Sequence, residues 1–208
     1  MRRAFYKFFG EGRVYLTRLF YGLELPQEWK DALRALQTAL KAKQVQANAW
    51  NNPDLLHMTV LFLGQMEEES LTNVVAAGEK AVQDCRPFQL TTGSLGQFSR
   101  NKVFWLGLDK QHSDWQALNH LHQQVKAAIL AQLPLDLDEK RYRPHITLAR
   151  KLQQHVDVDR LALPEPLTAT FTDLCLFEST RIDGQLCYPI RHRFAFTSHA
   201  DEEMPMKW

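Results

Sequence analysis

The sequence predicts an α+β fold of two halves, related by a pseudo-two-fold, whose largely antiparallel sheets line a central cleft while the helices lie outside. One observation is the order of the segments, in which apolar runs of strand length alternate with longer segments of helical periodicity. The other is a pair of similar tripeptides, His57-Met58-Thr59 and His145-Ile146-Thr147, each inside an apolar run. Their histidines are 88 residues apart, and each tripeptide follows a strand and a helix, which favours two repeated halves.

The first part of the chain carries clear signals for each of its elements. Residues 19–21 are Leu, Phe and Tyr, whose bulk favours extended backbone. Pro26 suits the first turn of a helix, and the apolar residues after it recur every three or four positions, as on one face of an amphipathic helix. Gly64 is expected to close the first His-Thr strand. The predicted elements are a strand at 14–25, a helix at 27–43, a polar loop at 44–53 and a strand at 55–63.

The second part is predicted in the same way. Three glutamates at 67–69 suit the start of a helix, because acidic side chains complement the positive end of the helix dipole, and a helix start is a better interpretation than a metal site. The pair Asp183-Gly184 is typical of a hairpin turn. The predicted elements are a helix from 67 to about 84, strands at 88–98 and 102–109, a helix at 114–132, the second His-Thr strand at 142–148, and strands at 167–177 and 185–197.

Composition and charge limit the classes of partner. The formal net charge of +1 gives no overall field for a long polyanion, so any nucleic-acid contact is expected to be local and short. Three widely spaced cysteines, Cys85, Cys175 and Cys187, favour free thiols in a reducing cytoplasm over disulfides or a zinc site. No apolar stretch is long enough to span a membrane. We therefore expect a cytoplasmic protein with no membrane contact and no obligate protein partner.

The two tripeptides are the candidate site. In a strand, residues two apart point to one face, about 7 Å from each other, so each histidine shares a face with its threonine. The residues between and after them would then face a core: Met58, Val60, Ile146 and Leu148. Our hypothesis is that the two strands lie side by side and present two imidazoles and two hydroxyls to one small anion.

Paired H-x-T-x motifs in these settings resemble the two-histidine (2H) phosphoesterase superfamily, and in particular its LigT-like RNA 2′,3′-cyclic phosphodiesterases. The resemblance covers about residues 17–197. It implies a single bilobal domain, placed here at 14–198, and leaves both ends of the chain uncovered. Residues 1–13 mix aromatic and basic side chains and are expected to be a weakly packed N-terminal extension, with a membrane-touching arm as the alternative, and residues 199–208 are expected to be a tail. Further matching stretches are Leu61-Phe62-Leu63-Gly64, Gly96-Gln97-Phe98, Val103-Phe104-Trp105-Leu106-Gly107 and Pro144 to Arg150.

The resemblance also implies a reaction. It is the opening of a 2′,3′-cyclic phosphate, at the end of an RNA or on a nucleotide, to a 2′-phosphate without a metal or other cofactor. Some members of the family also form 2′,5′ RNA linkages reversibly. Two imidazoles can act as acid and base near neutral pH, and the hydroxyls of Thr59 and Thr147 can donate to the phosphoryl oxygens. The family implies that His57 is the general acid and His145 the general base, an orientation that the residues alone leave open.

Substrate contacts are predicted around the second motif and from aromatic residues. Arg150 is the candidate for binding phosphate, within a basic cluster that also contains Lys140, Arg141, Arg143 and Lys151. Tyr142, Phe20 and Phe98 are candidates for stacking on a base, with burial in the core as the alternative for each. Trp105 is assigned to the core. His120 and His122, two apart on a helix, are expected to face solvent.

Other functions remain open from the sequence. The same four motif residues would serve an enzyme acting on 2′,5′-oligoadenylates or on other nucleotides. A non-catalytic module that binds RNA ends is a further alternative, which the intact motifs disfavour. A metal site using His57 and His145 is disfavoured because no carboxylate or thiol stands at ligand spacing near them.

Overall fold

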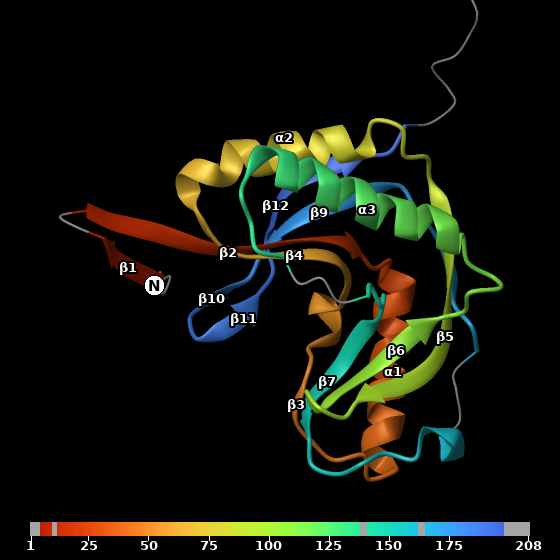
Figure 1. Cartoon of the computed structure of the whole chain (residues 1–208). Coiled ribbons are helices and arrows are strands. Elements are labelled where there is room, and N and C mark those ends of the chain that lie inside the picture. Colours follow the sequence, from red (N-terminus) through yellow and green to blue (C-terminus); the bar gives the residue numbers. More distant parts are fainter. Residues whose placement is uncertain (1–4, 10–11, 138–140, 162–164, 198–208) are drawn as a thin grey trace, which may run out of the picture.

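The structure, a computed structural model, describes residues 5–9, 12–137, 141–161 and 165–197 (Figure 1). The predicted tail and Lys140 lie outside these ranges. A ten-stranded sheet dominates, with the central order β12-β9-β2-β4-β7-β6-β5-β8, while β1 pairs with β2 and β3 with β7. Its strands are β1 (Phe5–Phe9), β2 (Gly12–Glu24), β3 (Ala47–Trp50), β4 (His57–Glu67), β5 (Phe88–Phe98), β6 (Val103–Leu108), β7 (Ile146–Leu152), β8 (Thr168–Phe171), β9 (Asp173–Glu178) and β12 (Ile190–Ala195).

All strand pairs in the described ranges are antiparallel, which confirms the predicted α+β class with antiparallel sheets. A separate hairpin, β10 (Thr180–Ile182) and β11 (Gln185–Cys187), turns at the predicted Asp183-Gly184. Both turn residues have positive φ, +50° and +80°, as a tight hairpin turn requires.

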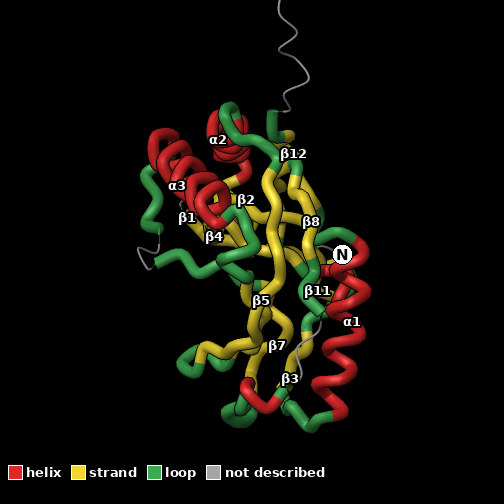
Figure 2. The backbone as a smooth tube through the Cα atoms, turned by 90° about the vertical axis from the view of Figure 1, so that its right-hand side faces the viewer, coloured by secondary structure: helices red, strands yellow, loops and turns green. Residues whose placement is uncertain are grey.

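Three α-helices cover the sheet in the described part of the chain: α1 (Gln27–Ala42), α2 (Leu71–Val82) and α3 (Trp115–Gln132). Figure 1 shows α2 and α3 together over β2, β4, β9 and β12, and α1 behind β6 and β7. Figure 2 shows the same separation from the side, with α1 beside β3 and β7 and far from α2. The helices therefore divide the molecule into two lobes.

The two halves of the chain are interlocked across these lobes. The helix of the first half, α1, lies on the strand of the second motif, where Gln37 Nε2 donates to the carbonyls of Leu148 at 3.1 Å and Asn51 at 2.9 Å. The helix of the second half, α3, packs against β4 of the first motif. Apolar side chains from both halves consequently pack together in the main core, and Phe20, Cys175 and Phe177 form a second, smaller cluster.

The two His-Thr strands are neighbours in the sheet, as predicted. β4 and β7 meet through one bridging pair, Met58 with Ile146, and both side chains are 0% exposed. Val60 and Leu148 are also buried, at 2% and 0%, whereas the histidines and threonines of both motifs are half-buried. The expected division of each motif into a core face and an open face is therefore confirmed.

Several element boundaries differ from the prediction because of pairing partners far away in sequence. Residues 5–9, expected to be a weakly packed extension, form β1 on β2, and the predicted loop 44–53 contains β3, which pairs with β7. Gly64 does not end β4. It lies in an irregularity opposite Leu19 and Phe20, with φ +81°, and the ladder to β2 continues to Glu67.

The other differences have local causes. Because β4 extends to Glu67 and Glu68–Ser70 form a 3₁₀ turn, α2 begins only at Leu71, and the three glutamates do not open it. The second His-Thr strand begins at Ile146 instead of residue 142, since Pro144 has no N–H for a ladder. Pro189 likewise separates β11 from β12. The predicted strand at 167–177 is divided at Thr172 into two strands: β8, which pairs with β5, and β9, which pairs with β2 and β12.

The interlock predicts a stability effect for Gln37, which is 3% exposed. The change Gln37→Ala removes the donor to two carbonyls, and we expect the free energy of unfolding to fall by about 1–3 kcal/mol. Urea unfolding followed by circular dichroism would measure it. Gln116→Ala, at an exposed position of α3, is the matched control and should change stability little. Equal stabilities of the two variants would show that the interlock contributes nothing.

Candidate active site

The two histidines are held in the same way at the start of their strands. His57 is the first residue of β4, and His145 directly precedes β7. Nδ1 of His57 lies 2.9 Å from the carbonyl oxygen of Leu55, and Nδ1 of His145 lies 2.7 Å from that of Arg143. A carbonyl oxygen only accepts, so the proton of each neutral ring is on Nδ1. Among the residues that the structure describes, none forms a hydrogen bond with Nε2 of either ring, so both Nε2 atoms are available for proton transfer.

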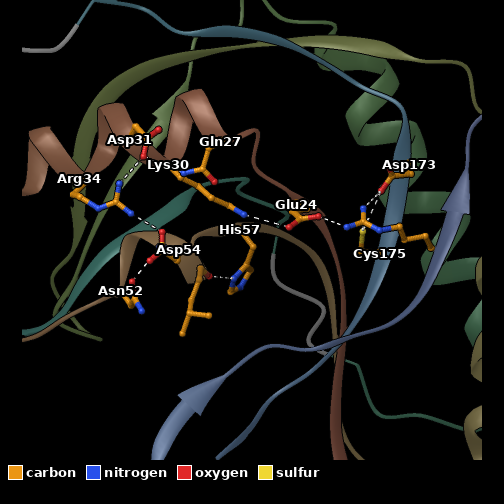
Figure 3. A network of polar contacts seen from close by, with 12 residues as sticks. Glu24, Gln27, Lys30, Asp31, Arg34, Asn52, Asp54, His57, Asp173 and Cys175 are labelled. Atoms are coloured by element: carbon orange, nitrogen blue, oxygen red, sulfur yellow. Dashed lines mark hydrogen bonds and ion pairs between the residues drawn. The ribbon is translucent and has the colours of Figure 1, made fainter.

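The turn before His57 is fixed by polar contacts, which Figure 3 shows. Residues Pro53–Leu55 form a 3₁₀ turn, and the side chain of Asn52 accepts from the backbone N–H of Asp54 at 3.1 Å. The carboxylate of Asp54 forms an ion pair with Arg34 of α1. These contacts set the position of the Leu55 carbonyl, and through it the ring of His57.

Aromatic rings support each histidine. His57 lies 4.7 Å from Phe20, 4.8 Å from Tyr188 and 5.7 Å from Phe177, measured between ring centroids. His145 lies 5.0 Å from Phe98 and 6.2 Å from Trp105. Each imidazole is thus packed against apolar surface, which restricts its orientation.

Trp105 is only half-buried and lies beside His145, so its assignment to the core was wrong. Its ring rests where Gly96 has no side chain: a Cβ there would come within 2.3 Å of the indole. Gly96 therefore makes room for the ring that supports the second histidine.

Burial lowers the pKa of both histidines. For His57 it lowers the pKa to about 4; the hydrogen bond to Leu55 opposes the shift, and the positive charges of Arg150 and His145 add to it. For His145, burial again lowers the pKa, the carbonyl of Arg143 opposes, and Arg150 adds to the shift. In the free protein both rings are accordingly neutral at pH 7. A bound phosphate anion would act in the opposite direction and raise both pKa values.

An irregularity after each threonine places one more side chain on the open face. Along β4, Tyr21 pairs with Leu61 but Gly22 with Thr59; along β7, Phe104 pairs with Ala149 but Trp105 with Thr147. An extra residue inverts the alternation of side chains. The residues that become exposed are Phe62, at 58%, and Arg150, each the fifth residue after its histidine.

The predicted substrate residues lie in different settings. Arg150 is exposed, and its charge acts on both histidines. Phe98 is half-buried against His145. Phe20 is 2% exposed, so its ring offers a base almost no surface and instead supports His57.

Tyr142 connects the two strands. Its hydroxyl donates to the carbonyl oxygen of Thr59 at 3.2 Å, and its ring lies flat on that of His122, 4.1 Å away and 3° from parallel. His122 is 9% exposed, so the prediction that it faces solvent was wrong: α3 buries it against Tyr142. One side of the Tyr142 ring is therefore already covered.

Sequence reasoning missed Phe62, Phe177 and Tyr188. Only Phe62 had a signal, because it stands in its motif where Arg150 stands in the other. Phe177 and Tyr188 reach the site through strand pairing and the β10–β11 hairpin, which motif spacing does not reveal. Within the described ranges, no group of three His, Cys, Asp or Glu residues is placed to hold a metal ion. In the same part of the chain, no helix is long and apolar enough to cross a membrane.

The chain belongs to the family described as the 2′-5′ RNA ligase superfamily, which it matches over residues 25–183. This match, together with the relatives below, confirms the predicted resemblance to LigT-like two-histidine phosphoesterases.

The chain is similar to curated proteins and to solved structures of this family. The RNA 2′,3′-cyclic phosphodiesterase of Escherichia coli (strain K12) is 28% identical over 189 residues, which cover 86% of this chain and 97% of that protein. The protein of the same name from Geobacillus stearothermophilus is 28% identical over 140 residues, or 66% of this chain; the match spans only 43% of that relative. The structure of E. coli LigT complexed with 3′-AMP aligns with a TM-score of 0.68 at 25% identity, covering 88% of this chain and 99% of LigT.

The low pKa of His57 predicts a pH-dependent stability. As the pH falls, the unfolded histidine binds a proton near pH 6.5, whereas the folded one does so only near pH 4. The contribution of His57 to the free energy of unfolding is therefore fully present above pH 6.5 and is lost as the pH falls to about 4. Between pH 7 and pH 5, we expect wild-type protein to lose about 2 kcal/mol more of its unfolding free energy than His57→Gln. Urea titrations at both values would measure this, and parallel losses would contradict it.

Proposed function

We propose that this protein hydrolyses 2′,3′-cyclic phosphodiesters, at RNA ends or on nucleotides, to 2′-phosphomonoesters by two-histidine acid–base catalysis. The observation that carries the proposal is the pair of imidazoles on adjacent strands, each with Nδ1 bonded to a carbonyl and Nε2 free. Each also shares its face with a threonine hydroxyl. The activity named for the relatives supports the same reaction.

In the proposed mechanism His145 Nε2 takes a proton from water while the water oxygen attacks phosphorus. The bond from phosphorus to O3′ breaks, and His57 Nε2 gives its proton to O3′, so the product is a 2′-phosphate with a free 3′-hydroxyl. Thr59 and Thr147 donate hydrogen bonds to the non-bridging oxygens, whose negative charge increases in the transition state. Arg150 supplies positive charge beside them.

The acid role requires that His57 be protonated when substrate is bound. In the free protein the pKa of His57 is about 4, too low for an acid at neutral pH. The negative phosphodiester beside the ring offsets part of this shift. His57 would therefore take up its proton when the substrate binds, so its acid form would be present only in an occupied site.

The same residues support a second reaction, on 2′,5′-linked nucleotides. If a 5′-hydroxyl replaces water in the step above, the product is a 2′,5′ linkage instead of a 2′-phosphate. In the reverse direction His57 takes the proton of the 3′-hydroxyl and His145 protonates the leaving 5′ oxygen. The neutral state of His57 in the free protein favours this base role. Ligation, and cleavage of 2′,5′-oligoadenylates, are thus the alternative activities.

Replacing either histidine tests the proposal against a non-catalytic binding module. With 2′,3′-cyclic AMP as substrate, His57→Ala and His145→Ala should each lower kcat by about 10²–10⁴-fold, the usual contribution of one proton transfer. Product would be followed by chromatography, with and without EDTA. His112→Ala, on the exposed turn before α3, is the control and should keep full activity. Wild-type protein that hydrolyses no cyclic phosphate would rule the proposal out, and loss of activity with EDTA would contradict the metal-independent mechanism.

A substrate with a better leaving group distinguishes the acid from the base. A nucleoside 2′-(4-nitrophenyl phosphate) releases nitrophenolate, which needs no proton. On this ester the 3′-hydroxyl attacks, as in the reverse direction above, and nitrophenolate leaves in place of the 5′ oxygen that His145 protonates. His145→Ala should therefore recover at least tenfold of its lost activity on this ester relative to 2′,3′-cyclic AMP, whereas His57→Ala should not. Release of nitrophenolate would be followed by absorbance. Recovery by His57→Ala instead would reverse the two assignments.

A further inference from the structure

Three arginines act electrostatically on Tyr188, beside the candidate site. They are Arg18 on β2, Arg150 on β7 and Arg181 on β10, and the positive charge of each reaches the Tyr188 phenol. All three side chains are exposed. The ring of Tyr188 packs edge-on against His57, at 4.8 Å, and against Phe20, at 5.5 Å. Tyr188 thus lies against His57 and within reach of the positive charge of these arginines.

The strand register gives the direction in which this surface extends. On the β2–β4 ladder Glu24 pairs with His57, Phe20 with Phe62 and Arg18 with Gln65. Moving away from His57 along the two strands, the surface therefore first presents Phe62, which packs 5.7 Å from Phe20, and then Arg18.

The β10–β11 hairpin adds the second cation. The backbone N–H of Ser179 donates to the carbonyl oxygen of Arg18 at 2.7 Å, so β10 begins beside Arg18, and Arg181 follows two residues later. Figure 1 shows this hairpin below the long β2 strand, on the side away from α2 and α3. The backbone of Arg18 and the start of β10, which carries Arg181, are far apart in sequence and are brought together at this point.

Arg18, Arg150 and Arg181 differ from the two arginines of β12 in their ion pairs. Arg191 forms ion pairs with Glu68 and Glu178, and Arg193 with Glu24 and Asp173. Among the residues that the structure describes, no carboxylate forms an ion pair with Arg18, Arg150 or Arg181. Arg181 does donate one hydrogen bond, to the carbonyl oxygen of Gly184 at 2.7 Å, and a guanidinium has five N–H groups. The cationic surface is therefore available to an anion.

Phe62 gives this surface an aromatic face. It is the most exposed of the large apolar side chains, at 58%, within the described part of the chain. Exposed aromatic rings next to unpaired cations are the combination by which proteins hold single-stranded RNA, the rings stacking on bases and the cations contacting phosphates.

We propose that Arg18, Phe62, Arg181 and Tyr188 form an outer subsite for the nucleotide that precedes the cyclic phosphate in an RNA chain. Its base stacks on Phe62, and the phosphodiester that joins it to the terminal nucleotide contacts Arg18 and Arg181. The proposal rests on the proposed function, and it specifies the substrate as the end of an RNA strand in preference to a free cyclic mononucleotide. A net charge of only +1 fits such short, local recognition.

The test compares two substrates, 2′,3′-cyclic AMP and a trinucleotide ending in a 2′,3′-cyclic phosphate. Wild-type protein should have the higher kcat/KM on the trinucleotide. In the double variant Arg18→Ala/Arg181→Ala, the ratio of the two kcat/KM values should fall by at least tenfold, the loss expected for one charged hydrogen bond to phosphate. Arg86→Ala, at an exposed arginine after α2, is the matched control for loss of positive charge and should leave the ratio unchanged.

The outcomes separate the two proposals. If wild-type protein hydrolyses both substrates and the double variant keeps the wild-type ratio, the outer subsite is wrong and the proposed function stands. If wild-type protein hydrolyses neither, the proposed function fails, and binding decides the subsite: a fluorescent trinucleotide ending in a 2′-phosphate should bind the double variant at least tenfold more weakly by anisotropy. Equal binding would overturn the subsite. Phe62→Leu should weaken the same binding, and the wild-type affinity should fall with added salt.

Discussion

The contact between Met58 and Ile146 is the interaction on which the site depends. It is the bridging pair that joins β4 to β7, and it brings together two motifs that are far apart in sequence. Truncating either side chain to alanine in such a fully buried position costs about 2–5 kcal/mol. The hydrophobic effect acts here on the residues that lie between each histidine and its threonine. The core face of each motif holds the strands together, and the open face is thereby set in place for chemistry.

The local part of this arrangement could be predicted from the sequence, because it follows from side-chain alternation within one strand. His57 and Thr59 share a face and Met58 lies opposite, as spacing alone requires. The alternation fails after each threonine, where the ladder is irregular, and Phe62 and Arg150 become exposed at equivalent positions. Such irregularities depend on the register with a distant strand, so no window of sequence around the motif predicts them.

The other side chains whose burial was predicted wrongly are also placed by contacts with distant parts of the chain. His122 was expected to face solvent because helix spacing separates it from His120, but Tyr142 covers it. Trp105 is a large aromatic residue of the kind that usually lies in a core. It lies beside His145 because Gly96 leaves space for its ring. The prolines are different: Pro144 and Pro189 interrupt the predicted strands for a local reason, and the start of β7 could have been predicted from Pro144 alone.

The electrostatics of the site follow from the burial that the fold imposes. Aromatic rings remove water from both imidazoles, which lowers their pKa values, and Arg150 lowers them further. A cationic histidine pair is therefore unfavourable while the site is empty. In the proposed reaction a bound phosphodiester would change this balance, since its negative charge would interact favourably with Arg150 and with a protonated ring. In the proposed mechanism Arg150 would thus have two effects of opposite sign: its charge lowers the pKa of His57 in the empty site, and it would attract the anion that raises this pKa again. Replacing Arg150 with a neutral residue would raise the pKa of His57 in the empty site and weaken the attraction of the anion. Protonation of His57 would then depend less on whether the site is occupied.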